Sequence, residues 1–109
     1  MVEKDISWIP GTHYSGMFGY LKLTLPKQLP ESVDKVIVLD TDLVLTADIA
    51  LLWREFDSLE ADGDRCFGIA EEQATWYLPN STNPGYKTWP ALGIGFNTGV
   101  MLMHLARLR

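Results

Sequence analysis

The hydrophobic residues of the chain fall into short segments separated by polar stretches, and their spacing differs from one segment to the next. Over residues 12–25, apolar side chains recur four, three and four positions apart, which is the spacing of one helix face. These residues are Tyr14, Phe18, Leu21 and Leu25. The pattern predicts a helix that Thr12 caps and Pro26 ends.

The remaining segments alternate between strands and helices. Residues 36–39, VIVL, are continuously apolar, as in a strand buried on both faces of a parallel sheet. Thr46 is a natural N-cap for a second helix. Its apolar face comprises Ile49, Leu52, Trp53 and Phe56. Residues 66–70 and 96–103 predict two further strands, separated by a long loop, and residues 104–109 predict a helix. This order is typical of an α/β fold.

Composition narrows the class of protein. A chain of 109 residues with 47% hydrophobic and 21% charged residues is one small globular domain at most. The net charge of −5 and the scattered basic residues argue against a nucleic-acid partner. A single cysteine, Cys66, excludes a disulfide within the chain and a cysteine zinc cluster. No apolar run approaches the roughly 18 residues of a membrane span.

The strand at residues 36–39 runs directly into two carboxylates, Asp40 and Asp42, with Thr41 between them. Ligands of α/β proteins bind beyond the carboxyl ends of such strands. One aspartate there can simply cap a turn, but two repel each other unless a cation lies between them. Divalent metals accept carboxylate oxygens and commonly bridge to phosphates. The pattern therefore favours a metal site over a turn.

Two classes of enzyme place Asp-x-Asp after an apolar strand. Phosphatases of the haloacid-dehalogenase type use the first aspartate as nucleophile, but Gly and then Thr or Val usually follow their motif, whereas Leu43 and Val44 follow here. Nucleotide-sugar transferases of the GT-A type use the pair to hold Mn²⁺ against a diphosphate, and their motif has apolar flanks on both sides. The second class fits better, and the phosphatase remains a further alternative.

Two longer stretches carry a more specific resemblance. KVIVLDTDLVLTADIALLW (residues 35–53) and FNTGVMLMHLARLR (residues 96–109) resemble the two signatures of glycosyltransferase family 8. The resemblance implies an α/β domain of the GT-A type, which is Rossmann-like and incomplete here. Residues 1–109 are accordingly expected to be a central fragment of the catalytic domain, truncated at both ends and inactive by itself.

The same resemblance implies an activity. Family 8 enzymes are retaining glycosyltransferases that use Mn²⁺ and a UDP-sugar donor to extend a glycan, often on a glycoprotein. Within the family, WYLPN and WPALGIGFNTGV are most similar to Golgi xylosyltransferases, so UDP-xylose is the implied donor. The residues themselves leave UDP-glucose, UDP-galactose and UDP-glucuronate open as alternatives. A type II membrane protein of the Golgi lumen is also implied, with any membrane anchor outside this chain. A non-catalytic module that binds glycans or nucleotide sugars is the alternative.

Carried over by position, the resemblance implies roles for individual residues. Asp40 and Asp42 are the implied metal ligands, with Asp40 also near the ribose and Thr41 presenting its backbone to the nucleotide. Lys22 matches a lysine near the donor, although a solvated lysine on a helix is an equal alternative. Tyr20 stands where some members carry an arginine. Asn97 is the implied catalytic residue that faces the transferred sugar, and Gly99 is a glycine of close approach.

The long loop at residues 71–95 is rich in aromatic side chains. Trp76, Tyr77 and Trp89 form a candidate wall for the acceptor, because flat aromatic faces stack on sugar rings, although packing under the loop is the commoner role. Glu71 and Glu72 lie at the end of the second strand, at the same edge of the sheet as Asp-x-Asp, where an acid or acceptor-orienting role stays open, although solvated charge is the expectation. Asn80 begins an NST glycosylation pattern that matters only in a luminal protein. His13 and His104 have no partner at metal-ligand spacing, which indicates structural roles.

Overall fold

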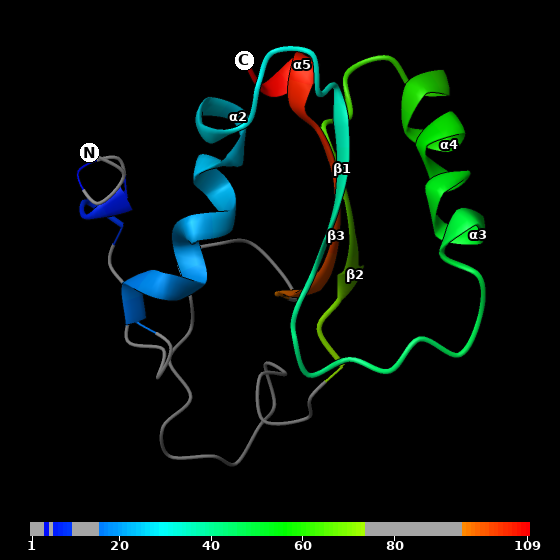
Figure 1. Ribbon diagram of the computed structural model, residues 1–109, viewed down its shortest axis with the longest axis horizontal. Coiled ribbons are helices and arrows are strands. Elements are labelled where there is room, and N and C mark those ends of the chain that lie inside the picture. Colours follow the sequence, from blue (N-terminus) through cyan, green and yellow to red (C-terminus); the bar gives the residue numbers. More distant parts are fainter. Residues whose placement is uncertain (1–3, 5, 10–15, 74–94) are drawn as a thin grey trace.

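The computed structural model describes residues 4, 6–9, 16–73 and 95–109, and Figure 1 shows how their elements are arranged around a sheet. The strands are β1 (Lys35–Leu39), β2 (Phe67–Glu71) and β3 (Phe96–His104). The helices are η1, a 3₁₀ helix (Gly16–Thr24), α2 (Leu25–Gln28), α3 (Ile49–Trp53), α4 (Glu55–Ala61) and α5 (Leu105–Leu108). The predicted α/β class is confirmed.

Strand β3 is the central strand of the sheet, whose order is β1-β3-β2. It pairs antiparallel with both neighbours, with Val38 opposite Met101 and Ile69 also opposite Met101. The predicted parallel sheet is therefore wrong for the described strands. Strands β1 and β2 do run in the same direction, but β3 lies between them in the opposite direction. As a result, the start of β3 lies at the same edge of the sheet as the ends of β1 and β2.

Helices cover both faces of this sheet, with η1 and α2 on one side and α3 and α4 on the other (Figure 1). Successive side chains of a strand point to opposite faces, so β3 supplies both layers of the core. Met101 and Met103 pack on the α2 side, where they meet Leu105 and half-buried aliphatic residues. Leu102 points to the opposite face, where it packs with Phe56 and Leu59 of α4.

The predicted first helix differs from the observed one. Residues 16–24 form a 3₁₀ helix, and a short α-helix follows in which Pro26 occupies the first turn instead of ending it. A proline is tolerated there because its missing N–H has no partner within the helix. A 3₁₀ helix has three residues per turn, so Phe18 and Leu21 share one face of η1, and that face is exposed. Leu25 lies in the α-helix that follows and packs against the core. Thr12 and Tyr14 lie outside the described residues.

The second helix begins two residues later than predicted. Asp48, not Thr46, is the N-cap of α3, and its Oδ1 accepts a hydrogen bond of 2.9 Å from the backbone N–H of Ala50. A carboxylate also interacts favourably with the positive end of the helix dipole. Of the predicted apolar face, Phe56 is fully buried and Leu52 packs beside it, while Ile49 and Trp53 stay partly exposed.

Two arginines of the C-terminal segment tie the helical layers to the end of β3. Arg107 Nη1 donates to the carbonyl oxygens of Leu59 and Arg65, at 3.1 and 2.9 Å. Arg109 donates to four carbonyl oxygens at and after the C-terminus of α2. These belong to Pro26, Leu29, Pro30 and Glu31. Helix C-termini leave such carbonyls without intrahelical partners, so the guanidinium groups satisfy them.

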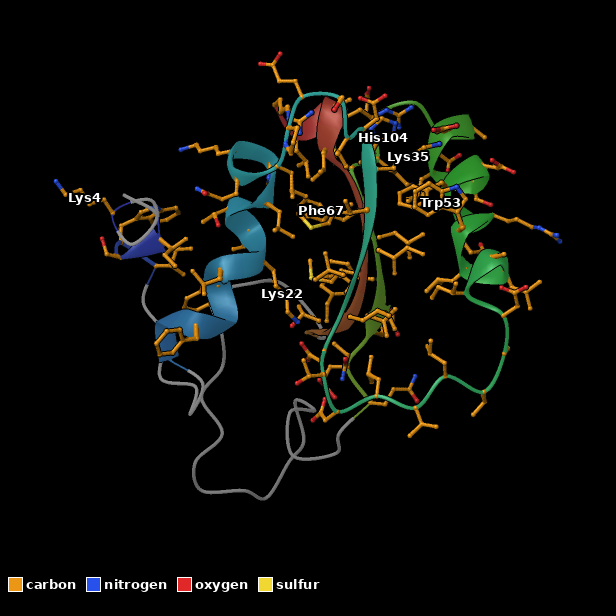
Figure 2. The ribbon with its side chains drawn as sticks, viewed as in Figure 1. Lys4, Lys22, Lys35, Trp53, Phe67 and His104 are labelled. Carbon is orange, nitrogen blue, oxygen red and sulfur yellow. The ribbon has the colours of Figure 1, made fainter. Side chains whose placement is uncertain are left out.

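A charged cluster on the face of the sheet that α3 and α4 cover joins α4 to the sheet. Lys35 Nζ lies 2.8 Å from Glu60 Oε1 and 5.4 Å from the centroid of the Phe56 ring. His104 Nε2 lies 3.5 Å from the same Glu60 oxygen, and Lys35, Trp53 and His104 are labelled in Figure 2. The hydrogen bond from Lys35 lowers the pKa of Glu60 below its ordinary value of 4.5, and the charges of Lys35, His104 and Arg107 act in the same direction. His104 thus has a structural contact, as predicted.

No helix within the described ranges is long and apolar enough to cross a membrane.

Replacing Met103 by Ala should destabilise the protein by about 2–5 kcal/mol, because the side chain is fully buried and its removal leaves a cavity. Urea denaturation measures the free energy of unfolding. Leu51→Ala is the matched control, since Leu51 is 53% exposed and should lose well under 1 kcal/mol, as is usual for surface positions. Equal losses in the two variants would contradict the assignment of Met103 to the core.

Glu60→Gln should reduce the dependence of stability on acid pH. A carboxylate whose folded-state pKa is lowered contributes stability that is fully present above its unfolded pKa, near 4.5, and is lost as the pH falls through its folded pKa. The variant should therefore be less stable than the wild type at pH 7 and converge with it in acid. Urea unfolding from pH 7 to pH 3 measures this, with Glu31→Gln as the control. A constant difference at every pH would contradict the prediction.

Candidate functional site

The candidate site lies where the end of β1, the start of β3 and the segment after β2 meet. Asp40 follows β1 directly, and its backbone N–H donates to Gly99 O at 2.8 Å, which continues the pairing of β1 with β3. The residue after β2, Glu72, donates its backbone N–H to Gly95 O, also at 2.8 Å. The antiparallel path of β3 therefore places the two predicted motifs, Asp-x-Asp and FNTGV, side by side.

Lys22 reaches this edge from η1 and joins the two motifs. Its ammonium group donates to Asp40 Oδ1 at 2.5 Å and to the carbonyl oxygen of Thr98 at 2.6 Å. Figure 2 shows the side chain extending from η1 toward the sheet. The Lys22 side chain is 19% exposed and that of Asp40 is 44% exposed, so the pair is partly shielded from water. The alternative of a freely solvated lysine is therefore wrong.

The side chain of Asn97 is fixed from both ends of its amide. Its Oδ1 accepts a hydrogen bond of 2.9 Å from the backbone N–H of Gly99, and its Nδ2 donates to Glu72 Oε2 at 3.5 Å. Because an N–H must meet the carbonyl oxygen and a carboxylate must meet the amino group, the two partners together define the orientation of the amide. Asn97 itself remains exposed, so one face of its amide is accessible.

Gly99 lies where a side chain would crowd the site. A Cβ atom on this residue would be 3.0 Å from Asn97 Oδ1 and 3.5 Å from Asp40 Oδ2. The first distance is too short for an unstrained contact, so a larger residue would displace the amide of Asn97. The close neighbours of Gly99 are thus side chains of the site itself, and its close approach to a ligand stays a prediction.

Glu72 lies at the edge of the sheet where its position in the sequence placed it, but its contact with Asn97 was not predicted. It is half-buried and contacts Asn97, whereas solvated charge was expected. Glu71 is exposed, as predicted, and pairs with Phe96 at the edge of the sheet. The signal was present in the position of Glu72, since it follows a strand that ends at the same edge as the Asp-x-Asp motif. Its contact could not be predicted, because it depends on where β3 begins.

The donor atoms suit a divalent cation only in part. Asp40 and Asp42 supply carboxylate oxygens, which hard cations prefer, and Thr41 and Asp42 lie exposed in the turn after β1. Within the described ranges no group of three His, Cys, Asp or Glu side chains could hold a metal. Two carboxylates without a protein cage are nevertheless a common arrangement where a substrate phosphate completes the coordination. The residues therefore fit a cation that binds together with a phosphate-containing ligand.

Other predicted residues are less informative. The proposed acceptor wall, Trp76, Tyr77 and Trp89, lies outside the described residues, as do Asn80 and His13. Tyr20 is half-buried in η1 near Lys22 in sequence.

Comparison with known proteins agrees with these motifs. The family model described as "Glycosyl transferase family 8" matches residues 3–109. The chain belongs to glycosyltransferase family 8. It is 50% identical over 108 residues to the xylosyl- and glucuronyltransferase LARGE2s of Danio rerio and 46% identical to LARGE1 of Homo sapiens. Each alignment covers 99% of this chain but only 14% of the relative.

A solved structure is similar as well. The crystal structure of mouse xyloside xylosyltransferase 1, in its apo form, superposes with a TM-score of 0.65 at 28% sequence identity. The match covers 99% of this chain and 41% of the mouse chain. The predicted glycosyltransferase fold of the GT-A type is thereby supported over nearly the whole chain, and the predicted family is confirmed.

Gly99→Ala should disturb the site more than the fold. The added methyl group would push against Asn97 Oδ1, while Gly99 is not part of the buried core. We expect the nucleotide sugar that is proposed below as the donor to bind at least tenfold more weakly, about 1.4 kcal/mol, with a loss of stability below that of Met103→Ala. Calorimetric titration and urea denaturation measure the two effects. A variant that binds as the wild type does would show that the amide position is unimportant.

Proposed function

We propose that the protein transfers a sugar from a nucleotide-sugar donor to a glycan, with UDP-xylose as the donor and Mn²⁺ as the metal. The single observation that carries the proposal is the meeting of Asp40, Asn97 and Lys22 at one edge of the sheet in a chain of family 8. Relatives named as xylosyl- and glucuronyltransferases, and a xylosyltransferase among similar structures, support xylose as the transferred sugar.

The polar groups at this edge have the capacity that such a donor requires. An ammonium group has three N–H donors, and the structure uses two of those of Lys22, on Asp40 and Thr98. The third is available for a phosphate or sugar oxygen. The amide of Asn97 has a second N–H and a second lone pair free for sugar hydroxyl groups. Lys22 is thus proposed to bind the donor, and Asn97 to act as the catalytic residue that orients the transferred sugar.

Asp40 and Asp42 are proposed to hold the metal, in keeping with the general use of a divalent metal by this family. A divalent metal bound there would stabilise the negative charge that develops on the leaving diphosphate. Asp40 and the backbone of Thr41 are proposed to contact the nucleotide. Gly99, which leaves room for the Asn97 amide and the Asp40 carboxylate, is proposed to allow the donor to approach both. Transfer is proposed to retain the anomeric configuration of the donor, as the resemblance implies.

The acceptor and the location of the protein are further parts of the proposal. The acceptor is a glycan, and the names of the relatives favour one that is extended with xylose. Trp76, Tyr77 and Trp89 are proposed to form its binding wall. A location in the Golgi lumen, as part of a type II membrane protein, follows from the resemblance to secretory-pathway enzymes. No observation favours the phosphatase, because the chain belongs to a transferase family.

The test is a calorimetric titration of UDP-xylose and of UDP into the protein, with and without Mn²⁺. We expect binding that requires the metal and weakens at least tenfold in Asp42→Asn, since the variant loses a charged metal ligand. Glu31→Gln removes an exposed carboxylate near the opposite end of β1 and should bind as the wild type does.

The outcomes separate the proposal from its alternative. Binding that EDTA does not weaken, together with affinity for a glycan alone, would instead support a non-catalytic binding module. Transfer of xylose to a glycan acceptor, followed by NMR of the anomeric proton, tests the reaction and its stereochemistry.

A further inference from the structure

We propose that Lys22 competes with a divalent cation for Asp40, and that a nucleoside diphosphate relieves this competition, so that metal and diphosphate bind the site cooperatively. The inference rests on the function proposed above, because it concerns the same carboxylates. It goes further because it states what controls the binding of the cation to these carboxylates, and it assigns this control to the ammonium group of Lys22.

The first argument is geometric. Lys22 Nζ lies 2.5 Å from Asp40 Oδ1 and 2.6 Å from the carbonyl oxygen of Thr98, so the ammonium group is held between one acceptor just after β1 and one in β3. A carboxylate oxygen at this distance from an ammonium group forms a strong, charge-assisted hydrogen bond. A metal that takes both oxygens of Asp40 must displace Lys22, and a metal that takes only Oδ2 must bind next to a positive charge.

The second argument concerns charge. Asp40 and Asp42 together carry two negative charges, and Lys22 neutralises one of them. A divalent cation alone therefore meets an Asp40–Asp42–Lys22 group with a net charge of −1, and within the described residues no third His, Cys, Asp or Glu joins these two carboxylates as a metal ligand. The partial shielding of the Lys22–Asp40 pair makes this neutralisation stronger than it would be in open solvent. The bare site should consequently bind a divalent cation weakly.

A bound diphosphate changes both the geometry of the Lys22–Asp40 contact and the charge of the site. Its oxygens supply the ligands that the described side chains lack, and its negative charge attracts Lys22 as well as the metal. Lys22 can then direct N–H groups to the phosphate while Asp40 turns to the cation. Coupling between two ligands is reciprocal, so the factor by which UDP raises the affinity for Mn²⁺ must equal the factor by which Mn²⁺ raises the affinity for UDP.

The experiment measures binding of Mn²⁺ alone and in the presence of saturating UDP, from the electron paramagnetic resonance signal of free Mn²⁺. In the wild type, UDP should strengthen Mn²⁺ binding, with a coupling factor in the range of ~5- to 150-fold that is usual for linked sites. In Lys22→Met, Mn²⁺ alone should bind roughly tenfold more tightly, and the coupling factor should shrink by a similar amount. UDP alone should bind no more tightly in this variant.

Controls separate local competition from general electrostatics. Lys22→Arg keeps the charge and should retain most of the coupling. Lys4→Met removes one positive charge at a position far from Lys22 in Figure 2 and should leave Mn²⁺ binding unchanged. Lys22→Gln provides a second neutral side chain, and circular dichroism checks the fold of each variant. In an Asp40→Asn background, Lys22→Met should no longer strengthen Mn²⁺ binding, because the contested carboxylate is gone.

The proposal is overturned if Lys22→Met and Lys22→Gln bind Mn²⁺ alone no more tightly than the wild type, or if Lys4→Met shows the same gain. Either result would leave the proposed function intact as long as the wild type binds UDP with Mn²⁺. Failure of the wild type to bind UDP under any condition would instead refute the proposed function, and the competition model with it.

Discussion

The position of β3 between β1 and β2, antiparallel to both, is the constraint on which the rest of the structure depends. This strand supplies the buried side chains for both helical layers, with Met101 and Met103 on one face and Leu102 on the other. Its direction also brings the polar residues at its start to the edge where β1 and β2 end. Core packing and the assembly of the site thus follow from a single strand.

The two edges of the sheet at which the strands end carry different kinds of contact. At the edge near the end of β1, polar groups on Asp40, Asn97 and Glu72 remain accessible or half-buried, and Lys22 connects them to η1. At the opposite edge, Arg109 secures the end of α2 through backbone carbonyl groups, and Lys35 holds α4 through Glu60. The charged contacts that fix α2 and α4 therefore lie away from the site, whereas η1 is joined to the site itself through Lys22.

The arrangement also explains how one lysine can serve a site built from strands. Lys22 lies on a 3₁₀ helix that packs beside the sheet, not on a strand, so its long side chain approaches the strand ends from the side. The carbonyl of Thr98 gives the ammonium group a fixed second partner. A backbone acceptor does not depend on the identity of the side chain at that position, which makes the placement of Lys22 a property of the fold. The chain spans 14% of the length of the LARGE relatives that it matches.

The sequence by itself determined where the strands lie, which family the chain belongs to, and that the Asp-x-Asp pair and Asn97 are candidate site residues. Apolar runs and short motifs are local properties of the chain, so they can be recognised without the structure. The sequence did not determine the direction of β3, the 3₁₀ form of residues 16–24 or the contact of Glu72 with Asn97. An apolar run is equally compatible with parallel and antiparallel pairing, and helical spacing alone does not distinguish a packed α-helix from a tighter one. Tertiary contacts decide these features. The pairing with β1 and β2 fixes the direction of β3. That direction in turn brings the polar partners of Lys22 and Glu72 within reach of their side chains.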